Sequence, residues 1–415
     1  MSNKHAPGWW VPTLYFAEGI PYFIVNVISV TMFKRLGMPN GDLAMYTSLL
    51  YLPWVIKPLW SPFVDVIHTK RWWILLTQAL CTAGFAALAF SVSPGAFGAA
   101  LVIFYLTAFA SATHDIAADG FYMLALDEKR QAAFVGIRST FYRIASVFGQ
   151  GVIVVLAGVL EERSGNIPHA WRCTLFASAG LFALLTLWHR HFLPRVEDGA
   201  REHTDARAVF RGFAEAWKSF FRKPGAGPAV AFLLLYRLPE ALSVKMLTPF
   251  LLDPVEAGGL GLGTAQSGLV YGTVGVVALT AGGILGGLFA AGRGLRRSLW
   301  PMSLALALPC AVYLLLALVQ PPLWAVYLCV ALDQFGYGFG FTAYMLYMMQ
   351  FSEGPFKTSH YAICTAFMAL SMMIPGLFAG WMQETLGYVG FFISVMICCS
   401  ATVFVTFSAR RRCSA

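Results

Sequence analysis

Long apolar stretches fill this sequence, and they constrain the fold more than any other feature. A helix needs about 20 mostly apolar residues to cross the hydrocarbon core of a bilayer. Stretches of this length lie at 9–33, 43–66, 72–92, 97–126, 132–160, 173–193, 228–252, 267–291, 299–319, 323–351, 358–382 and 388–408. We therefore expect about twelve transmembrane segments, six on each side of a polar interval.

The composition excludes an ordinary soluble domain. Hydrophobic residues make up 58% of the chain and charged residues 12%, whereas soluble domains carry roughly 25% charged residues. Backbone polar groups inside a bilayer must be paired within a helix or a closed barrel, and nothing here alternates with the period of a strand. The prediction is an all-α integral membrane protein.

The interval between the two sets of stretches predicts a three-part organisation. We expect a six-helix half at 1–193, a cytoplasmic linker at 194–227 and a second six-helix half at 228–415. Apolar residues recur at helical spacing among basic ones in this linker, namely Val209, Phe210, Phe213, Trp217 and Phe220. This pattern is typical of an interfacial helix, although a plain solvated linker is the alternative.

The distribution of lysine and arginine predicts the orientation. If both termini are cytoplasmic, the loops on that side carry 20 basic residues and the opposite loops carry 4. Cytoplasmic loops are enriched in Lys and Arg, so this orientation is the expected one. The net charge of +9 is then assigned to anionic headgroups rather than to nucleic acid. The first apolar stretch is too long for a cleavable signal and lacks a small-residue cleavage site.

Weak internal similarity supports two related halves. Residues 18–21 align with 236–239 at an offset of 218, and residues 122–124 recur at 344–346 at an offset of 222. Either match alone is weak because apolar tripeptides recur by chance. The two nearly equal offsets together indicate duplication, which is common in transporters.

Charged residues inside the predicted spans are the most informative part of the sequence. Each charge at the bilayer centre costs ~2.5–3.5 kcal/mol even on the lenient insertion scale. The spans or their ends carry Lys57, Arg138, Arg143, Arg237 and Lys245, together with Glu18, Asp65, Asp115, Asp119, Glu240 and Asp333. Bases and acids nearly balance, which predicts a paired, water-accessible interior.

Helical spacing indicates which spans line this interior. Polar residues three or four positions apart share one face of a helix. Such sets are Tyr15, Glu18, Tyr22 and Asn26; Asp115, Asp119 and Tyr122; Arg138 with Tyr142, beside Arg143; and Arg237 with Glu240. We expect the first, fourth, fifth and seventh spans to face a central pathway. The alternative is that some of these pairs only lock helices together.

Buried carboxyl groups are the predicted proton carriers. A carboxyl group that alternates between wet and dry surroundings can load and release a proton, which suits Glu18, Asp115, Asp119 and Glu240. His114 also titrates near neutral pH and adjoins Asp115. A lone buried histidine is more often a hydrogen-bonded structural residue, so both interpretations of His114 stay open.

Motifs of enzymes and pumps are missing from the sequence. We find no zinc-type His/Glu spacing, Walker loop or cofactor fingerprint, and the cysteines lack the spacing of metal ligands. We therefore expect no enzyme activity, no metal and no cofactor other than a coupling proton. A membrane-embedded enzyme or lipid-handling protein that uses the same buried charges is the remaining alternative class.

A loop after the second span resembles a known family signature. The segment PFVDVIHTKR at 62–71 is similar to the signature loop of the major facilitator superfamily, and GGLFAAGR at 286–293 is a looser copy. The resemblance implies that Asp65, Lys70 and Arg71 act as a cytoplasmic gating latch. A loop whose charges only fix topology is the alternative.

Three further segments resemble one branch of that superfamily. YFAEGIPY at 15–22, LPWVIKPLWSP at 52–62 and ATHDIAADG at 112–120 are similar to the AmpG-type muropeptide permeases. The resemblance implies a bacterial inner-membrane protein that imports anhydro-muropeptides, sugar–peptide fragments of the cell wall, together with protons. It also implies that the pathway contains Glu18, Lys57, Asp115, Asp119 and Arg138.

The expected mechanism is rocking of the two halves around a central site in a monomer. Aromatic residues would stack on sugar rings and arginines would pair with carboxylates of the peptide stem. The expected substrate contacts are Tyr15, Tyr22, Asn26, Lys57, Tyr122, Arg138, Tyr142, Arg143 and Arg237. Neighbouring subfamilies carry siderophores or other amphipathic molecules, so these remain alternative substrates.

Overall fold

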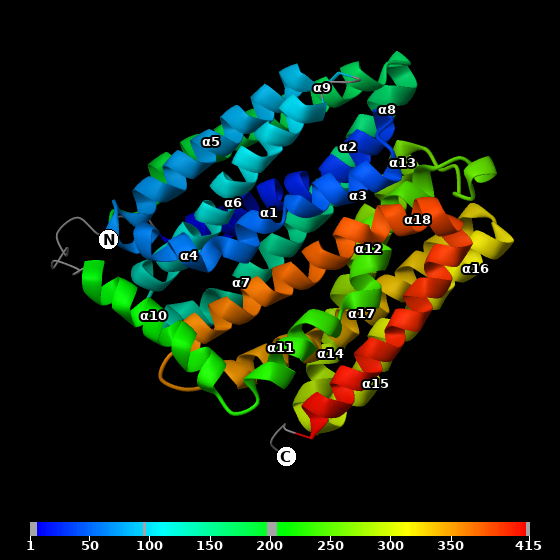
Figure 1. Cartoon of the computed structure of the whole chain (residues 1–415). Coiled ribbons are helices and arrows are strands. Elements are labelled where there is room, and N and C mark those ends of the chain that lie inside the picture. Colours follow the sequence, from blue (N-terminus) through cyan, green and yellow to red (C-terminus); the bar gives the residue numbers. More distant parts are fainter. Residues whose placement is uncertain (1–5, 94–96, 197–205, 412–415) are drawn as a thin grey trace. The chain divides into compact units, whose positions relative to one another are not determined.

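The computed structural model describes residues 6–93, 97–196 and 206–411. Within these ranges every regular element is a helix, which confirms the prediction of an all-α membrane protein. The helices form two compact units, drawn in Figure 1. Unit 1 comprises residues 1–37 and 56–210, and unit 2 comprises 38–55 and 211–415.

Unit 1 contains the helices that follow most of the first half of the sequence. Their bounds are α1 (Pro7–Phe23), η2 (Ile24–Ile28), α2 (Ser29–Arg35), α4 (Leu52–Val66), α5 (Lys70–Ser91), α6 (Phe97–Ala125), α7 (Glu128–Val147), η3 (Phe148–Ile153), α8 (Val154–Ser164) and α9 (Ile167–Phe192). The π-helical segments η2 and η3 interrupt two otherwise α-helical spans, and such segments occur frequently at functional sites.

The packing of unit 1 brings α1, α6 and α7 together. Helix α1 contacts both α6 and α7, and α5 contacts both α6 and α9. Trp10 on α1 packs edge-on against Phe121 on α6, with ring centroids 5.2 Å apart. Gly149 lets η3 approach α1 closely, because a Cβ atom there would lie 2.7 Å from the Cβ of Phe23. This packing places the polar faces of α1 and α6 beside each other.

Unit 2 contains the remaining helices. Their bounds are α3 (Asn40–Leu49), α10 (Ala206–Arg222), α11 (Ala226–Leu235), α12 (Leu238–Leu252), η4 (Val255–Ala257), α13 (Thr264–Ser267), η5 (Gly268–Gly275), α14 (Val276–Arg293), α15 (Leu295–Ala307), η6 (Leu308–Cys310), α16 (Ala311–Val319), α17 (Leu323–Ser352) and α18 (Lys357–Arg410). Only the later residues of α10, from 211 on, fall in this unit, and the first four residues of α4, up to 55, also belong to it. Helix α18 consists of two helices that meet at Gly387, whose φ is 65°.

Small residues allow close helix contacts in unit 2. Helices α14 and α17 lie side by side (Figure 1). A Cβ atom at Gly286 would lie 2.7 Å from the carbonyl oxygen of Phe339 and 3.0 Å from the hydroxyl of Thr342. Glycine is therefore required at this crossing, as is common where membrane helices pack through small residues.

The second predicted span is divided between two helices. The sequence predicts one continuous span at 43–66, but the structure ends α3 at Leu49 and begins α4 at Leu52. Pro53 follows the break, at the start of α4, where its missing N–H is tolerated. Helix α3 packs on α12 and α18, and residues 38–55 accordingly group with unit 2.

The linker contains a helix, α10, at the place where the spacing predicts one. Its last turns hold Phe220, which is fully buried and packs edge-on against Phe351, with ring centroids 5.3 Å apart. Lys223 then donates hydrogen bonds to the carbonyl oxygens of Phe351 (2.6 Å) and Glu353 (2.7 Å). These contacts attach the end of α10 to α17.

Eight helical segments of the described residues are long and apolar enough to cross a membrane. One of them is α18, which contains two helices. The helical segments at 40–66 and 226–252 are each broken in two, and α17 carries Asp333 and Gln334 within its length. These features explain why only eight segments meet the criteria of length and hydropathy, whereas the sequence predicts about twelve spans.

Candidate functional site

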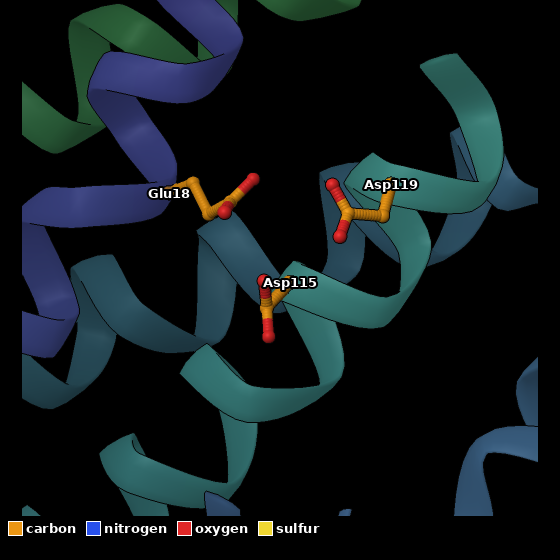
Figure 2. A group of neighbouring side chains, drawn as sticks. All are labelled: Glu18, Asp115 and Asp119. Atoms are coloured by element: carbon orange, nitrogen blue, oxygen red, sulfur yellow. The ribbon is translucent and has the colours of Figure 1, made fainter. Parts of the chain in front are cut away.

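Three carboxyl groups from two helices of unit 1 meet in one cluster. Glu18 lies on α1, and Asp115 and Asp119 lie one turn apart on α6, so that the two aspartates share a face. One oxygen from each of the three groups lies within 4.8 Å of the others. Figure 2 shows the three side chains directed toward one another.

Two cations accompany the three carboxylates, and both come from other helices. Lys57 on α4 donates a hydrogen bond to Asp115 Oδ2. Arg138 on α7 forms an ion pair with Asp119, with Nη2 and Oδ1 2.6 Å apart. Each aspartate therefore has its own cation. The structure brings together all five residues that the sequence resemblance assigned to the pathway.

Two tyrosines complete the surroundings of Arg138. Tyr15 donates a hydrogen bond to Asp119 Oδ1 at 3.1 Å. The guanidinium carbon of Arg138 lies 4.4 Å from the ring centroid of Tyr15 and 5.6 Å from that of Tyr122. Tyr122 uses its hydroxyl to donate to the carbonyl oxygen of Gln131 (2.5 Å). Its ring is therefore held in place while one face contacts the guanidinium.

Glu18 differs from both aspartates because it forms no ion pair with a cation among the described residues. Its side chain is buried, and its Oε2 atom accepts no hydrogen bond within the described part of the chain. With Lys57 and Arg138 balancing the aspartates, an ionised Glu18 would leave the cluster with one uncompensated negative charge. An uncompensated charge is costly at membrane depth.

The cluster is better suited to a proton than to a divalent metal. Carboxylate oxygens are the ligands that Ca²⁺ and Mg²⁺ prefer, but Asp115 and Asp119 already contact Lys57 and Arg138. A divalent ion would have to compete with both cations. One proton on Glu18 would balance the charge without displacing either of them.

The other predicted residues on α1 and α7 lie farther along these helices. Asn26, in the π-helical segment η2, donates to the carbonyl oxygen of Tyr22 (3.0 Å), and its own Oδ1 is buried without a partner in the described residues. Tyr142 contacts Phe23, with ring centroids 5.8 Å apart. Arg143 is half-buried. Tyr22, Asn26 and Tyr142 belong to helices that pack together.

His114 lies in a different cluster from the carboxylates. Gln78 on α5 hydrogen-bonds the Nε2 atom of His114 (3.0 Å) and the Nδ1 atom of His189 (2.9 Å), and His189 Nε2 contacts the hydroxyl of Thr13 (3.0 Å). Adjacent residues on a helix point in directions about 100° apart, which explains why the side chains of His114 and Asp115 lie in different clusters. Gln78 and His189 were not predicted as functional residues from the sequence, although both are polar residues in apolar spans.

Arg237 and Glu240 pair with each other in unit 2. Arg237 donates from Nε to Glu240 Oε2 (2.9 Å) and from Nη2 to Oε1 (3.2 Å), and it also donates to the hydroxyl of Tyr337 (2.9 Å). Its guanidinium carbon lies 4.8 Å from the ring centroid of Phe341. Arg237 is thus already neutralised by an acid three residues away.

Lys70 and Arg71 of the predicted gating loop contact other parts of unit 1. Arg71 donates to the carbonyl oxygens of Arg190 (2.6 Å) and Leu193 (3.2 Å). The buried side chain of Lys70 passes over α6, with its Cε 2.8 Å from the position of a Cβ atom on Gly120. The side chain of Asp65 lies outside the described part of the structure, so its role stays a prediction.

A second polar network, in unit 2, was not predicted from the sequence. Asn40 on α3 donates to Gln383 Oε1 (2.7 Å) and Asp253 Oδ2 (3.0 Å), and Tyr388 donates to the same Asp253 oxygen (2.6 Å). Asn40, Asp253 and the last two members, Gln383 and Tyr388, lie in three segments separated by more than a hundred residues. No local spacing could therefore have revealed the network.

Charged residues buried within membrane-spanning helices often mark substrate or ion pathways. The model of the Major Facilitator Superfamily matches residues 13–355. The chain belongs to this superfamily. It is a multi-pass membrane transporter of a small molecule and not an enzyme, in agreement with the sequence analysis.

Comparison with individual proteins shows which branch of the superfamily this chain resembles. The anhydromuropeptide permease of Escherichia coli K12 is 26% identical over 394 residues, which cover 92% of this chain and 75% of the permease. This similarity confirms the resemblance to AmpG-type permeases that the three short segments indicated.

Solved structures share the fold at low sequence identity. A bacterial homologue of the human lysosomal transporter Spinster has a TM-score of 0.74 and 15% identity, over 99% of this chain and 98% of that one. A D-xylose–proton symporter has a TM-score of 0.72 and 13% identity, over 96% and 95%. These likenesses establish the fold of the chain.

Proposed function

We propose that this chain imports anhydro-muropeptides together with protons, as a monomer of the bacterial inner membrane with both termini in the cytoplasm. The observation that carries the coupling is Glu18, a buried carboxyl group without a cation beside two aspartates that each have one. The substrate class is supported by the similarity to the E. coli anhydromuropeptide permease.

Protonation of Glu18 determines the net charge of the cluster. Like charges that share a small site cannot all ionise without cost, and the three carboxylate oxygens lie within 4.8 Å of one another. A proton on Glu18 makes the cluster neutral, and its release makes the cluster negative. If one conformation of the transporter favours the neutral cluster, the proton gradient biases the exchange of conformations.

Arg138 and its aromatic neighbours support a sugar-binding role for the same region. Tyr15 and Tyr122 present rings around the guanidinium, and aromatic faces of this kind can pack against sugar rings. Because Arg138 is already paired with Asp119, a substrate that contacts it would disturb the cluster. Substrate binding and protonation would then be coupled through one ion pair.

The test is uptake of labelled anhydro-muropeptide into proteoliposomes that contain the purified full-length chain. We expect uptake to rise when a proton gradient is imposed in the direction of transport and to fall when a protonophore collapses it. Asp119→Asn should abolish this gradient-driven uptake, because it removes the acid that links Arg138 to the cluster. Lys218→Met, which changes an exposed residue of α10, serves as the matched control.

Two results would overturn the proposal. Uptake that ignores the gradient, or that Asp119→Asn leaves undiminished, would remove the cluster from the coupling mechanism. Failure of the wild-type chain to bind or move anhydro-muropeptide, while a ferric siderophore is transported, would assign the protein to the alternative substrate class.

A further inference from the structure

Lys245 is a buried cation of unit 2 that lacks an acidic partner. It lies on α12 and is 7% exposed. Its ammonium donates one hydrogen bond, to the hydroxyl of Thr47 on α3 (3.1 Å), and lies 5.4 Å from the ring centroid of Tyr51. Among the salt bridges of the described residues, none includes Lys245.

The buried acids of the same unit are occupied elsewhere. Glu240 accepts two hydrogen bonds from Arg237. Asp333 accepts from the hydroxyl of Tyr313 (2.6 Å) and from the amide of Gln334 (3.0 Å). Neither acid forms a salt bridge or hydrogen bond with Lys245, so its charge has no protein counterion at contact distance in the described structure.

A lysine in this position has unused binding capacity. An ammonium group carries three N–H donors, and the structure supplies one acceptor, Thr47. A buried charge without a counterion is costly. Both facts favour an anionic ligand. Of the three arginines that the sequence suggested for this purpose, Arg138 and Arg237 are by contrast already paired with Asp119 and Glu240, whereas Arg143 of unit 1 is only half-buried and belongs to no salt bridge of the described residues.

A hydroxyl group and a glycine lie beside the ammonium. Ser48, the residue after Thr47 on α3, is fully buried, and its hydroxyl has no hydrogen-bond partner in the described residues. A Cβ atom on Gly376 of α18 would lie 2.2 Å from the hydroxyl oxygen of Ser48, 3.1 Å from Lys245 Cε and 3.2 Å from Ser48 Cβ, so the Ser48 hydroxyl packs directly against α18 at this glycine. Lys245 and Ser48 therefore border the same point, where α18 contributes no side chain.

We infer that Lys245, together with Thr47 and Ser48, forms a site for a carboxylate group of the transported substrate. The ammonium supplies the charge, and the hydroxyl of Ser48 supplies a further donor. The inference rests on the proposed function, since anhydro-muropeptides carry carboxylates on their peptide stems. It assigns recognition of the stem to α12 and α3 of unit 2, whereas the proposed proton site lies in unit 1.

The experiment compares two ligands that differ only in charge. One is an anhydro-muropeptide whose stem has a single carboxylate, and the other is the same compound as its amide. Binding of each is measured to the detergent-purified full-length chain, as wild type and as Lys245→Met, Lys245→Arg and Ser48→Ala. Lys218→Met again removes one exposed lysine as a control. Thermal unfolding of every variant shows whether it is folded.

The wild type should bind the acid at least about tenfold more tightly than the amide, as expected for a charge-assisted contact in a buried site. Lys245→Met should lose this preference while binding the amide as the wild type does. Lys245→Arg should keep the preference, and Ser48→Ala should reduce it.

A folded Lys245→Met variant that still prefers the acid would overturn the inference and leave the proposed function intact. The same conclusion would follow if Ser48→Ala and Lys245→Met lowered thermal stability but changed the affinities for acid and amide equally, since Lys245 would then only join α12 to α3. Failure of the wild type to bind either compound would overturn the inference and the proposed function together.

Discussion

Replacement of Glu18 by glutamine tests the central feature of the site, the carboxyl group without a cation. Glutamine keeps the size and the hydrogen-bonding capacity of a protonated glutamate but cannot ionise. Because Asp115 and Asp119 are balanced by Lys57 and Arg138, the substitution holds the cluster permanently neutral. The variant therefore imitates the proton-loaded transporter at every pH.

The size of the effect follows from the spacing of the carboxylates. Two unit charges at most 4.8 Å apart repel by at least about 3 kcal/mol at an effective dielectric constant of about 20, and the two cations offset part of this repulsion. A lone charge at membrane depth costs ~2.5–3.5 kcal/mol on the insertion scale. Both routes give a free-energy difference of about 3 kcal/mol between ionised Glu18 and its neutral replacement.

Two measurements can test this free-energy difference of about 3 kcal/mol. In detergent, wild type and Glu18→Gln should unfold at similar temperatures at acidic pH, where Glu18 is protonated. The variant should become the more stable of the two as the pH rises, by up to about 3 kcal/mol. In proteoliposomes the variant should lose accumulation driven by the proton gradient but keep exchange of substrate across the membrane, because exchange does not require release of the proton.

The reasoning would be refuted by a variant that still accumulates substrate with the pH dependence of the wild type. In that case Glu18 would not be the group that loads and releases the proton. A stability difference that does not change with pH would likewise show that the folded and unfolded chains release the Glu18 proton alike, so that ionised Glu18 carries no penalty in the cluster. Glu162→Gln, at an exposed glutamate of α8, is a matched control for the loss of one carboxyl group.

Two further substitutions test the neighbours of Glu18. Asp115→Asn leaves the Lys57 ammonium without its carboxylate; because these side chains are 19% and 22% exposed, we expect a loss of about 2 kcal/mol in thermal unfolding, below the value for a fully buried pair. The double variant Lys57→Met with Asp115→Asn should recover most of that loss, and a strictly additive result would argue against direct pairing. His114→Gln should retain gradient-driven uptake, because His114 contacts Gln78 rather than the carboxylates; loss of the gradient response in a folded variant would restore His114 as a proton relay.

The membrane fold could be predicted from the sequence because hydropathy is a property of single residues summed over a window. The same sum cannot detect a break in a helix. The span predicted at 43–66 is two helices, interrupted at Leu50 and Tyr51, and the span at 228–252 is interrupted at Tyr236 and Arg237. Both breaks precede a proline near the start of the next helix, at Pro53 and Pro239, and these prolines were the available signal.

The carboxylate cluster was predictable to the level of helix faces. Spacing of four residues places Asp115 and Asp119 on one face, and a membrane interior makes any such face a candidate site. Spacing could not indicate which base pairs with which acid, because that depends on the packing of α4 and α7 against α6. The separation of His114 from its neighbour Asp115 was nevertheless available from helix geometry alone, since adjacent residues do not share a face.

The choice of cations for substrate binding shows the limit of sequence reasoning most clearly. Arg138, Arg143 and Arg237 were expected to bind carboxylates of the substrate because arginine suits that role. The structure shows that Arg138 and Arg237 already bind carboxylates of the protein, whereas Arg143 is half-buried and in no salt bridge of the described residues. Lys245 has no acid three or four residues away on its own helix, and the described structure provides none from elsewhere. A cation that the protein leaves without a counterion is the one available to a ligand, and only the complete set of contacts within a unit can identify it.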